Sequence, residues 1–510
     1  MRILAIYPNE QGYGRLPLGL AILITILLEN GHEVELFDTT FVMQSDNIDN
    51  VVREKAKLVI PIEKSNLYEA KSCSEIDEMF NKRIFSFRPE LVIASILEEN
   101  YQYANRLLSL VKDFDKNIPV CVGGSTPSIA PHVVIENPNI DYLIQGEGEE
   151  ALLEFCTHIQ QGLSIENVKN IWYKKNGSIY HNSLRPFINL DDLPMTNFDQ
   201  WDDRHFLKPY NGRMYKAGFF ELSRGCPNVC SYCINETYHR LLSEAGHFFR
   251  QKSIDKVIAE MKLLKDLKNI EMILFCDDNF LMMSDARLQQ FSELYQKEVN
   301  LPYWINTTPE SINQYRLSIL KHTGCCGIGM GIETGNEWLR INILKKRTTN
   351  EALMRSFDLV HQAGIRTTAN NMIGFPGEYE ADIFETVKFN QLIAADSCDL
   401  NFVAPYIGTT IHAISIKLGY IDVMEEPGFR GMARNVSSRL GPVIHNPHIS
   451  RERFMEIYYN FMDYVEGRLP IPDQYLVPAP GSGEEVPLRG ELSIEAIKAM
   501  ASVVSSLHKC

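Results

Sequence analysis

The first 160 residues alternate short apolar runs with longer amphipathic stretches. Apolar runs of strand length lie at residues 2–8, 32–38, 89–97, 118–124 and 140–148. Helical periodicity is clearest in "PLGLAILITILLENG", which Pro17 opens and Gly31 ends, and in "YQYANRLLSLVKDF". Strands that alternate with helices at this pitch predict a parallel, doubly wound sheet, with a ligand site beyond the carboxyl ends of its strands.

Four loops at that edge are candidates for binding: "NEQGYGRLP", the stretch around Leu97, "GGSTPS" and "GEGEE". Gly12-x-Gly14 after the first strand is also compatible with a dinucleotide, but Pro17 stands where that fingerprint needs its third glycine. Gly123 and Gly124 either expose bare backbone to a large flat ligand or form a tight turn. The pattern leaves these alternatives open.

The alternation breaks between residues 163 and 215. "NIWYKKNGSIYHN" predicts a hairpin that turns at Asn176-Gly177, and the proline-containing "LDDLPMTNFDQWDD" predicts a connector. We therefore expect a first domain at residues 1–162 and a linker with a hairpin at residues 163–215.

A second alternation runs from Ala217 to Pro405. Its predicted strands lie at residues 217–223, 271–278, 302–308, 327–334, 366–374 and 400–405. The predicted helices between them include residues 253–267, 285–298, 312–324, 350–364 and 380–393. Repeated βα units close into a barrel whose working face lies at the carboxyl ends of the strands. Six units predict an open, partial barrel at residues 216–405.

The last hundred residues, 406–510, predict a mainly helical region. Helical patterns occur in "IHAISIKLG", "SRERFMEIYYNFMDYVEG" and "SIEAIKAMASVVSSLH". The intervening "GFRGMARNVSSRLGPVIHNPH" has no clear period. It either covers the open barrel and sets substrate choice or is a plain surface loop.

The composition of the chain argues against several classes of protein. The 510-residue chain carries a net charge of -15, which argues against nucleic acid as the main partner. The first residues read as a strand rather than a secretory signal, and the longest apolar run, about 13 residues, is too short to span a bilayer. Eleven cysteines in such a chain do not resemble a disulfide framework, so we expect a cytoplasmic protein.

Three cysteines stand within eight positions, in "ELSRGCPNVCSYCINE": Cys226, Cys230 and Cys233. A structural zinc site needs four ligands, and His239 is a candidate for the fourth. An iron–sulfur cluster fits better, because thiolates are its usual ligands and three of them leave one iron of a four-iron cluster free for a substrate.

CxxxCxxC with Tyr232 before the last cysteine, on the first loop of a six-unit barrel, resembles the radical S-adenosylmethionine (SAM) superfamily. "FCDDNF", "GIGMGIETGNEWL" and "NNMIGFPGE" resemble its further motifs. The resemblance implies a [4Fe-4S] cluster on the three cysteines and a SAM site. The SAM residues that it implies are Tyr232, Asp277, Glu333, Ile373 and Gly374.

The N-terminal region resembles the cobalamin-binding domain that precedes this barrel in one branch of the superfamily. The matching pieces are "LPLGLAILITILLENGHEVELFD", "VGGSTPSIAP" and "DYLIQGEGEEALLEF". The cobalamin contacts that the resemblance implies are Gly12, Gly14, Pro17, Leu97, Gly123, Gly124, Ser125, Gly146 and Glu147. The Asp-x-His-x-x-Gly motif that supplies a histidine ligand to cobalt is missing. Two alternatives therefore remain open. Either cobalamin binds without a histidine ligand from the protein, or the domain does not bind cobalamin.

The resemblance implies that reduced cluster and SAM generate a 5′-deoxyadenosyl radical, which abstracts hydrogen from an unreactive carbon. In the cobalamin branch the usual outcome is methylation of that carbon; oxidative cyclisation or rearrangement is the alternative. Such an enzyme implies a small-molecule or peptide substrate and a low-potential electron donor of the flavodoxin or ferredoxin type. A non-catalytic cobalamin or metal sensor is the interpretation from another class, and it would need no SAM motifs.

Overall fold

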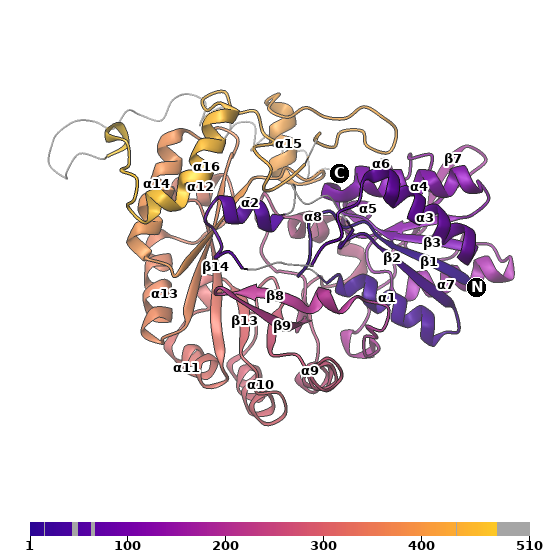
Figure 1. Cartoon of the computed structure of the whole chain (residues 1–510), viewed down its shortest axis with the longest axis horizontal. Helices are drawn as coiled ribbons and strands as arrows, with labels where there is room; N and C mark the ends of the chain where they lie inside the picture. The colour runs from indigo at the N-terminus through magenta and orange to yellow at the C-terminus, as the bar shows by residue number, and fades with distance from the viewer. Residues whose placement is uncertain (15, 43–48, 63–66, 435, 477–510) are drawn as a thin grey trace.

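A computed structural model describes residues 1–476, except 15, 43–48, 63–66 and 435. The helix predicted in "SIEAIKAMASVVSSLH" lies outside the described residues. Two sheets form the body of the molecule: an N-terminal α/β unit stands beside a curved second sheet, and the C-terminal segment lies against both (Figure 1). Among the described residues, no helix combines the length and apolar character that a membrane crossing requires.

The N-terminal sheet has the strand order β2-β1-β3-β4-β5-β6-β7. Its strands are β1 (Arg2–Tyr7), β2 (Glu33–Asp38), β3 (Leu91–Ser95), β4 (Val120–Gly123), β5 (Tyr142–Ile144), β6 (Ile171–Lys175) and β7 (Ser178–His181). The first five are parallel in the order of a flavodoxin-like doubly wound sheet, as predicted. The predicted hairpin forms at Asn176-Gly177, but β6 pairs antiparallel with β5. The hairpin therefore extends the sheet, whereas we expected it in the linker.

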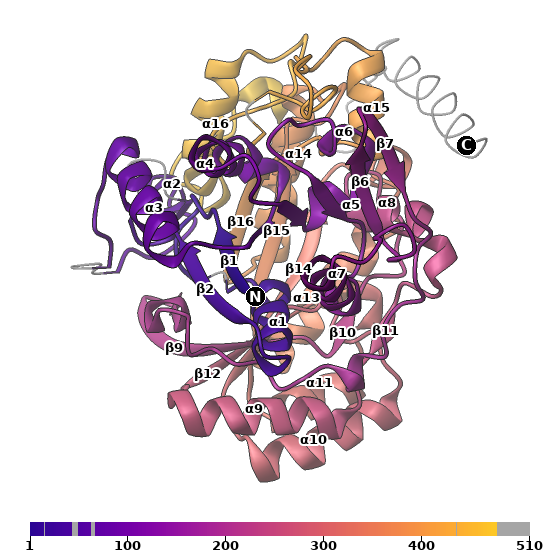
Figure 2. The same cartoon turned by 90° about the vertical axis from the view of Figure 1, so that its right-hand side faces the viewer.

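The helices of the N-terminal unit are α1 (Leu18–Glu29), α2 (Asp49–Lys55), α3 (Cys73–Phe87), α4 (Tyr101–Phe114), α5 (Ser125–Ile129), α6 (Pro131–Val134) and α7 (Glu149–Gln161). They flank its sheet, except α2, which lies at the edge of the curved second sheet (Figure 1). α1 and α7 pack on one face, and α3 and α4 on the other (Figure 2). Both faces of the central strands are therefore buried, which explains their nearly continuous apolar sequence.

The second sheet has the order β16-β15-β14-β13-β12-β9-β8 and curls into a half-barrel. Its strands are β8 (Leu207–Tyr210), β9 (Arg213–Phe220), β12 (Met272–Phe275), β13 (Tyr303–Thr307), β14 (Cys325–Glu333), β15 (Arg366–Ile373) and β16 (Ser397–Phe402). Six are parallel, which confirms the predicted partial barrel. The seventh, β8, is antiparallel and lies in the range that we expected to be a linker. Its Pro209 is tolerated because β8 is an edge strand.

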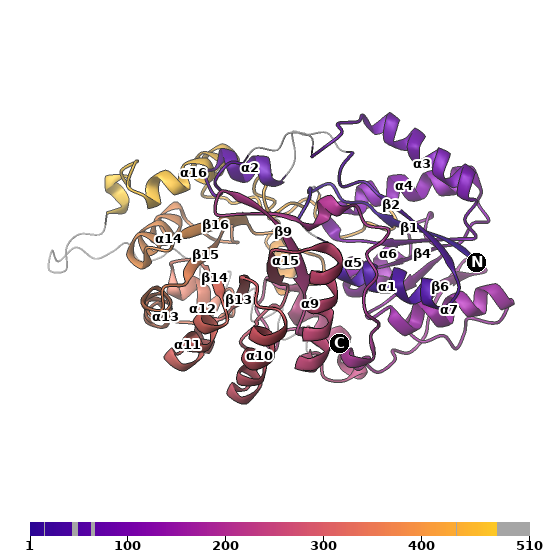
Figure 3. The same cartoon turned by 60° about the horizontal axis from the view of Figure 1, so that its bottom comes forward.

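Helices on the outside of the half-barrel match the predicted ones closely. They are α9 (Ile254–Lys268), α10 (Asp285–Glu298), α11 (Gln314–His322), α13 (Asn350–Gln362) and α14 (Glu380–Ile393). Further short elements near the carboxyl ends of the strands are β10 (Ser223–Arg224), α8 (Ile234–Leu241), β11 (Arg250–Gln251) and α12 (Glu337–Asn342). Figure 3 shows α9, α10, α11 and α13 side by side along the outer face.

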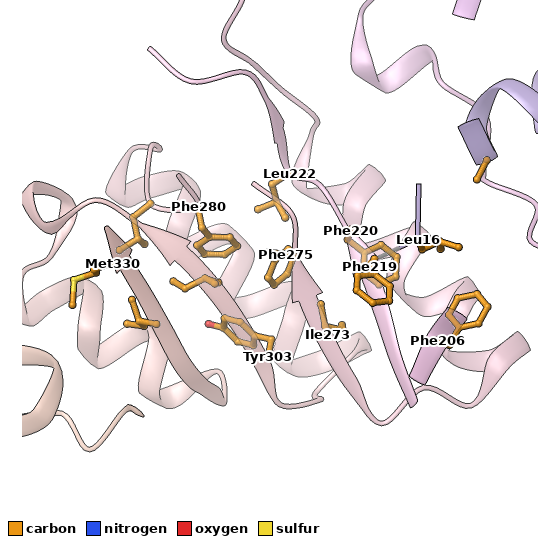
Figure 4. Close-up of a cluster of buried hydrophobic side chains, with 14 of the residues drawn as sticks. Leu16, Phe206, Phe219, Phe220, Leu222, Ile273, Phe275, Phe280, Tyr303 and Met330 are labelled. Carbon is orange, nitrogen blue, oxygen red and sulfur yellow. The ribbon is translucent and has the colours of Figure 1, made fainter. Parts of the chain in front are cut away.

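One apolar core runs from the N-terminal unit into the half-barrel. Leu16 lies beside Phe219 and Phe220 of β9, and the cluster continues through Phe275 to Tyr303 (Figure 4). The two units thus share buried surface, which fixes their relative position.

The C-terminal segment closes the open edge of the half-barrel. Helix α16 (Arg451–Val465) packs against α14, and Tyr458 stacks on Phe402 of β16 with ring centroids 4.9 Å apart. Helix α2 reaches the same edge from the N-terminal unit, where Arg53 Nε lies 3.5 Å from Asp399 Oδ1 (Figures 1 and 3). Between α15 (Thr410–Lys417) and α16, Phe429 stacks on Tyr101 of α4 at 4.3 Å. The aperiodic segment therefore lies between the two units and is not a free surface loop.

Candidate functional site

The three cysteines lie on the loop that joins β9 to α8, at the carboxyl end of the half-barrel. Cys226 is buried, Cys230 and Cys233 are half-buried, and Cys233 is the N-cap residue of α8. The Ser231 amide donates to the carbonyl of Leu344 at 3.0 Å, which ties the loop to the segment after α12. The loop is therefore held in place by a neighbouring part of the half-barrel.

The surroundings of these thiols favour a positively charged occupant. Burial raises the pKa of Cys226 and Cys230, and it raises that of Cys233 to about 12. Forming three thiolates here therefore requires cationic charge, which iron supplies. Lys346 contributes in the same direction, because its charge lowers the pKa of Cys226 and Cys230.

The zinc alternative depends on His239, and the geometry does not favour it. His239 Nε2 lies 2.6 Å from the carbonyl oxygen of Cys226, so this ring nitrogen is engaged with the backbone. Among the described residues, no group of three or more histidine, cysteine or acidic side chains is arranged around one metal ion. Three thiols without a fourth ligand suit an iron–sulfur cluster better than a structural zinc ion.

The two acids after β12 differ in their partners. Asp277 is buried, and its carboxylate accepts hydrogen bonds from the amides of Leu222 and Ser223 at 3.0 and 2.7 Å and from the Ser223 hydroxyl at 2.5 Å. Burial raises its pKa to about 6. Asp277 thus braces the strand that leads into the cysteine loop, and its role toward SAM stays a prediction. Asp278 instead faces the cavity described below and accepts from Asn235 at 3.1 Å.

Glu333 occupies a strained position at the end of β14. Its φ is 65°, which is unusual for a residue other than glycine, and the register of β14 against β15 shifts between Gly331 and Glu333. Its Oε1 accepts from Lys346 Nζ at 2.8 Å. A side chain at Gly331 would overlap both groups of this ion pair. Such local strain is typical of functional positions.

Tyr232 lies close to this acid. Burial is the main reason why the pKa of Tyr232 is raised, and a side-chain hydrogen bond to Glu333 acts in the same direction. The structure therefore brings together two of the residues that the resemblance assigned to SAM.

The turn after β15 is fixed by a buried acid that the sequence did not single out. Glu378 is fully buried, and its Oε2 accepts from the amides of Gly374 at 2.5 Å and Phe375 at 3.3 Å. Burial raises its pKa well above the ordinary value. The φ of Gly374 is 87°, a conformation that favours glycine. Ile373 and Gly374 are thus held in a defined backbone shape.

A cavity of about 490 Å³ lies between the N-terminal sheet and the cysteine loop. Cys233, Asp278 and Tyr238 line its side toward the half-barrel, and Leu23 and Leu152 line its deep part between α1 and α7. Its rim at the carboxyl ends of β4 and β5 contains five residues predicted to contact cobalamin: Gly123, Gly124, Ser125, Gly146 and Glu147. Among the described lining residues there is no histidine.

The rim of this cavity depends on bare backbone. A Cβ added at Gly124 would lie 2.6 Å from the carbonyl oxygen of Ile96, and φ there is 109°. A cavity lined by apolar side chains and by glycine backbone suits a large, flat, partly apolar cofactor such as cobalamin.

The other four predicted cobalamin contacts do not line this cavity: Gly12, Gly14, Pro17 and Leu97. The loop after β1 turns toward the edge strand β8, where Lys208 Nζ lies 3.4 Å from the carbonyl oxygen of Gly14. Leu97 is 43% exposed. The lining of the cavity therefore does not support these four residues as cobalamin contacts. The loop after β1 lies beside β8 and not at the cavity.

An ion-pair network links the cysteine loop to the N-terminal unit. Arg224, two residues before Cys226, donates to Glu147 at 2.8 Å, to Glu149 at 2.7 Å and to Glu221 at 3.0 Å. Arg250 also reaches Glu147, at 2.5 Å. Burial would raise the pKa of Glu147, but the two guanidinium groups outweigh this and hold it below its usual value. The acidic segment "GEGEE" therefore starts helix α7 and also forms ion pairs with Arg224, which precedes the three cysteines. No local sequence signal predicted these ion pairs.

Two parts of the chain resemble known protein families. The sequence profile of the Radical SAM superfamily matches residues 220–389, and that of the B12 binding domain matches residues 68–155. An uncharacterized methyltransferase of Pyrococcus horikoshii is 23% identical over 81% of this chain and 83% of its own length. An anaerobic magnesium-protoporphyrin IX monomethyl ester cyclase of Rubrivivax gelatinosus is 24% identical over 61% of this chain and 56% of its own.

A solved structure shares the fold over the whole chain. The radical S-adenosylmethionine methyltransferase TsrM of Kitasatospora setae, with cobalamin and a [4Fe-4S] cluster bound, superposes with a TM-score of 0.65, at 16% identity and over 99% of each chain.

These likenesses identify an enzyme of the radical SAM class. Within that class, the chain belongs to the radical SAM enzymes that carry an N-terminal B12-binding domain. The predicted fold, the enzyme class, and SAM and cobalamin as the cofactors of its two domain families are confirmed. The sensor and the dinucleotide interpretations receive no support, since both domain matches and the cysteine loop occur together.

Proposed function

We propose that this protein methylates an unactivated carbon of a small-molecule or peptide substrate. In this proposal Cys226, Cys230 and Cys233 hold a [4Fe-4S] cluster, and Tyr232 and Glu333 contribute to the SAM site. When bound, cluster and SAM supply a 5′-deoxyadenosyl radical, and cobalamin supplies the methyl group. A cytoplasmic setting with a flavodoxin- or ferredoxin-type electron donor belongs to the same proposal.

One observation carries the proposal: a single cavity is lined both by Cys233 of the cysteine loop and by the glycine-rich rim of the B12-binding domain. Two cofactors held on its two sides face the same space. The Arg224 network ties the two sides together. Methyl transfer needs both cofactors near one substrate carbon, and this arrangement provides the proximity.

The first experiment measures whether the cavity holds cobalamin. Gly19 lines the cavity on α1, and a Cβ added there would have no atom within 4 Å, so a side chain can begin at this position without a clash. We expect Gly19→Leu to fold normally, since leucine favours a helix more than glycine does. It should weaken cobalamin binding by at least about tenfold because it occupies the cofactor's space. Gly19→Ala is the matched control with a small side chain.

The readouts are cobalamin absorbance after anaerobic reconstitution and mass spectrometry of the product formed from SAM. Loss of cobalamin in Gly19→Leu but not in Gly19→Ala supports the proposed site. Equal cobalamin content in both variants contradicts it. The absence of a lining histidine further predicts a cobalamin spectrum without imidazole ligation.

The second candidate function is oxidative cyclisation or rearrangement without net methyl transfer. It is favoured by the similarity to the cyclase, which covers 61% of this chain. Methylation is preferred, because three relatives named as methyltransferases or a methylase are matched over 80–81% of this chain, against one such match to a cyclase. SAM labelled in its methyl group distinguishes the two: only methylation transfers the label to the substrate.

A further inference from the structure

A second cavity of about 470 Å³ lies between the B12-binding domain and the C-terminal segment. It shares no lining residue with the cofactor cavity. One wall comes from the loops after β1 and β3, and the other from residues 422–451. An open surface groove adjoins it through Gln102, Met424, Phe429 and Arg434, which line both, so a ligand can enter from outside.

Three carboxyl groups gather in the first wall: Glu10, Glu98 and Glu99. No ion pair of Glu10 or Glu98 is found among the described residues, whereas the Glu99 carboxylate already accepts from the Tyr406 hydroxyl at 2.7 Å. Glu98 is only 8% exposed; its Oε2 accepts from the Ile407 amide at 2.8 Å, and its Oε1 has no hydrogen-bond partner. A buried carboxyl oxygen without a partner is costly, and a ligand that donates a hydrogen bond would remove the cost.

Burial makes the ionised form of two of these carboxyl groups unfavourable. Burial, and to a smaller extent Glu99, raise the pKa of Glu98 to about 8, although the Ile407 and Ala433 amides act in the opposite direction. Burial likewise raises the pKa of Glu10 to about 7, with Arg106 as the opposing charge. A bound cation would compensate these groups.

The basic side chains on the opposite wall are largely committed elsewhere. Arg451 donates to the carbonyl oxygens of Pro442 and Leu440 at 2.8 and 3.2 Å. His445 pairs with Asp422 at 3.0 Å, and Arg434 is exposed at the mouth. The remaining surface is apolar: Tyr101 stacks on Phe429, and Met424, Met432 and Val436 complete the wall.

We propose that this cavity binds a small organic cation, a protonated amine carried on an aromatic or branched aliphatic body. The ammonium group would donate to Glu98 and its neighbours Glu10 and Glu99, and the apolar body would lie against Tyr101 and Phe429. This site is separate from the cofactor cavity and does not depend on the proposed methyl transfer.

The test compares probes of one shape and opposite charge on the full-length protein. Isothermal titration calorimetry measures binding of 2-phenylethylammonium and of 3-phenylpropionate. We expect the ammonium probe to bind in the millimolar range or tighter and the carboxylate probe to bind at least about tenfold more weakly. Cobalamin added in excess should leave the ammonium binding unchanged, because the two cavities are distinct.

Two variants locate the binding. Glu98→Gln keeps the size of the side chain but removes its ability to ionise, and it should weaken binding of the ammonium probe at least about tenfold. Because Glu98 also holds the Ile407 amide, Glu10→Gln is the second variant; it should weaken binding without touching that contact. Glu351→Gln, at an exposed position on α13, is the matched control and should have no effect.

Three results would overturn the proposal. They are equal or absent binding of the two probes, unchanged ammonium affinity in both Glu98→Gln and Glu10→Gln, and displacement of the ammonium probe by cobalamin.

Discussion

Arg224 offers the most stringent test of how the two domains are joined. Its side chain is 20% exposed and pairs with Glu147, Glu149 and Glu221, whose side chains are 13%, 6% and 16% exposed. Replacing it with methionine keeps the length of the side chain and removes the charge. Among the described ion pairs, Glu149 then loses its only partner, whereas Glu147 keeps Arg250 and Glu221 keeps Lys252 at 3.8 Å.

The expected decrease in the free energy of unfolding depends on which acidic groups keep a partner. Removing one partner of a buried ion pair costs about 3–5 kcal/mol, because a charge is left without compensation. Arg224 faces a cavity and two of its three partners keep another cation, so we expect about 2–3 kcal/mol. Glu149→Gln should relieve most of the loss, since the orphaned charge is then absent. The coupling energy between Arg224 and Glu149 should be about 1–3 kcal/mol.

Urea unfolding followed by tryptophan fluorescence measures these energies in a double-mutant cycle. Arg185→Met is the matched control, because Arg185 also pairs with acidic side chains of α7 although it lies outside that helix. Arg185 pairs with Glu150 and Glu154, which are 58% and 37% exposed, so its loss should cost about 1 kcal/mol or less. If Arg224→Met costs no more than Arg185→Met, or shows no coupling to Glu149, the network does not clamp the cysteine loop to the B12-binding domain.

Three further predictions concern the cluster, the SAM site and pH. Cys230→Ala should lower the iron content from about four per chain to less than one, whereas the half-buried Cys326 serves as a control whose replacement by alanine leaves the iron unchanged. Gly331→Ala should weaken SAM binding by about tenfold in calorimetry, because its Cβ would displace Glu333 and Lys346; equal affinity would argue against Glu333 at this site. The pKa of Glu98 rises from 4.5 to about 8 on folding, so its contribution to stability is complete below about pH 4.5 and is lost as the pH rises through about 8. Glu98→Gln should therefore raise the melting temperature relative to the unmodified chain more at pH 9 than at pH 5, and an equal difference at both values would refute the raised pKa.

The sequence predicted the elements that rest on local periodicity. Helices α4, α10 and α14 begin and end where the amphipathic pattern does, and all six parallel strands of the half-barrel were found. Periodicity failed where an element depends on a distant partner. Strand β8 contains Pro209 and exists because β9 pairs with it, and α2 lies against β16, far from its own sheet.

The residues of the candidate site likewise fall into those that local sequence predicts and those that depend on tertiary packing. Cys226, Cys230 and Cys233 were predicted from spacing, because a short loop keeps close in space whatever is close in sequence. Gly123, Gly124 and Gly146 were placed at the correct edge of the sheet, since parallel strands end on one side. Gly12 and Leu97 were assigned to the same cofactor but do not line the cavity that we propose for it; the loop after β1 lies against β8 instead.

The sequence by itself determined the two α/β units, the cysteine loop and the motifs that resemble a SAM site. Only the tertiary structure decided that Arg224 meets Glu147 and Glu149, that Asp277 braces the loop while Asp278 faces the cavity, and that a second cavity borders Glu98. The physical reason is that periodicity and spacing report interactions within one element or loop. Ion pairs and cavities between domains depend on side chains brought together from distant parts of the chain, and one sequence carries no local signal for them.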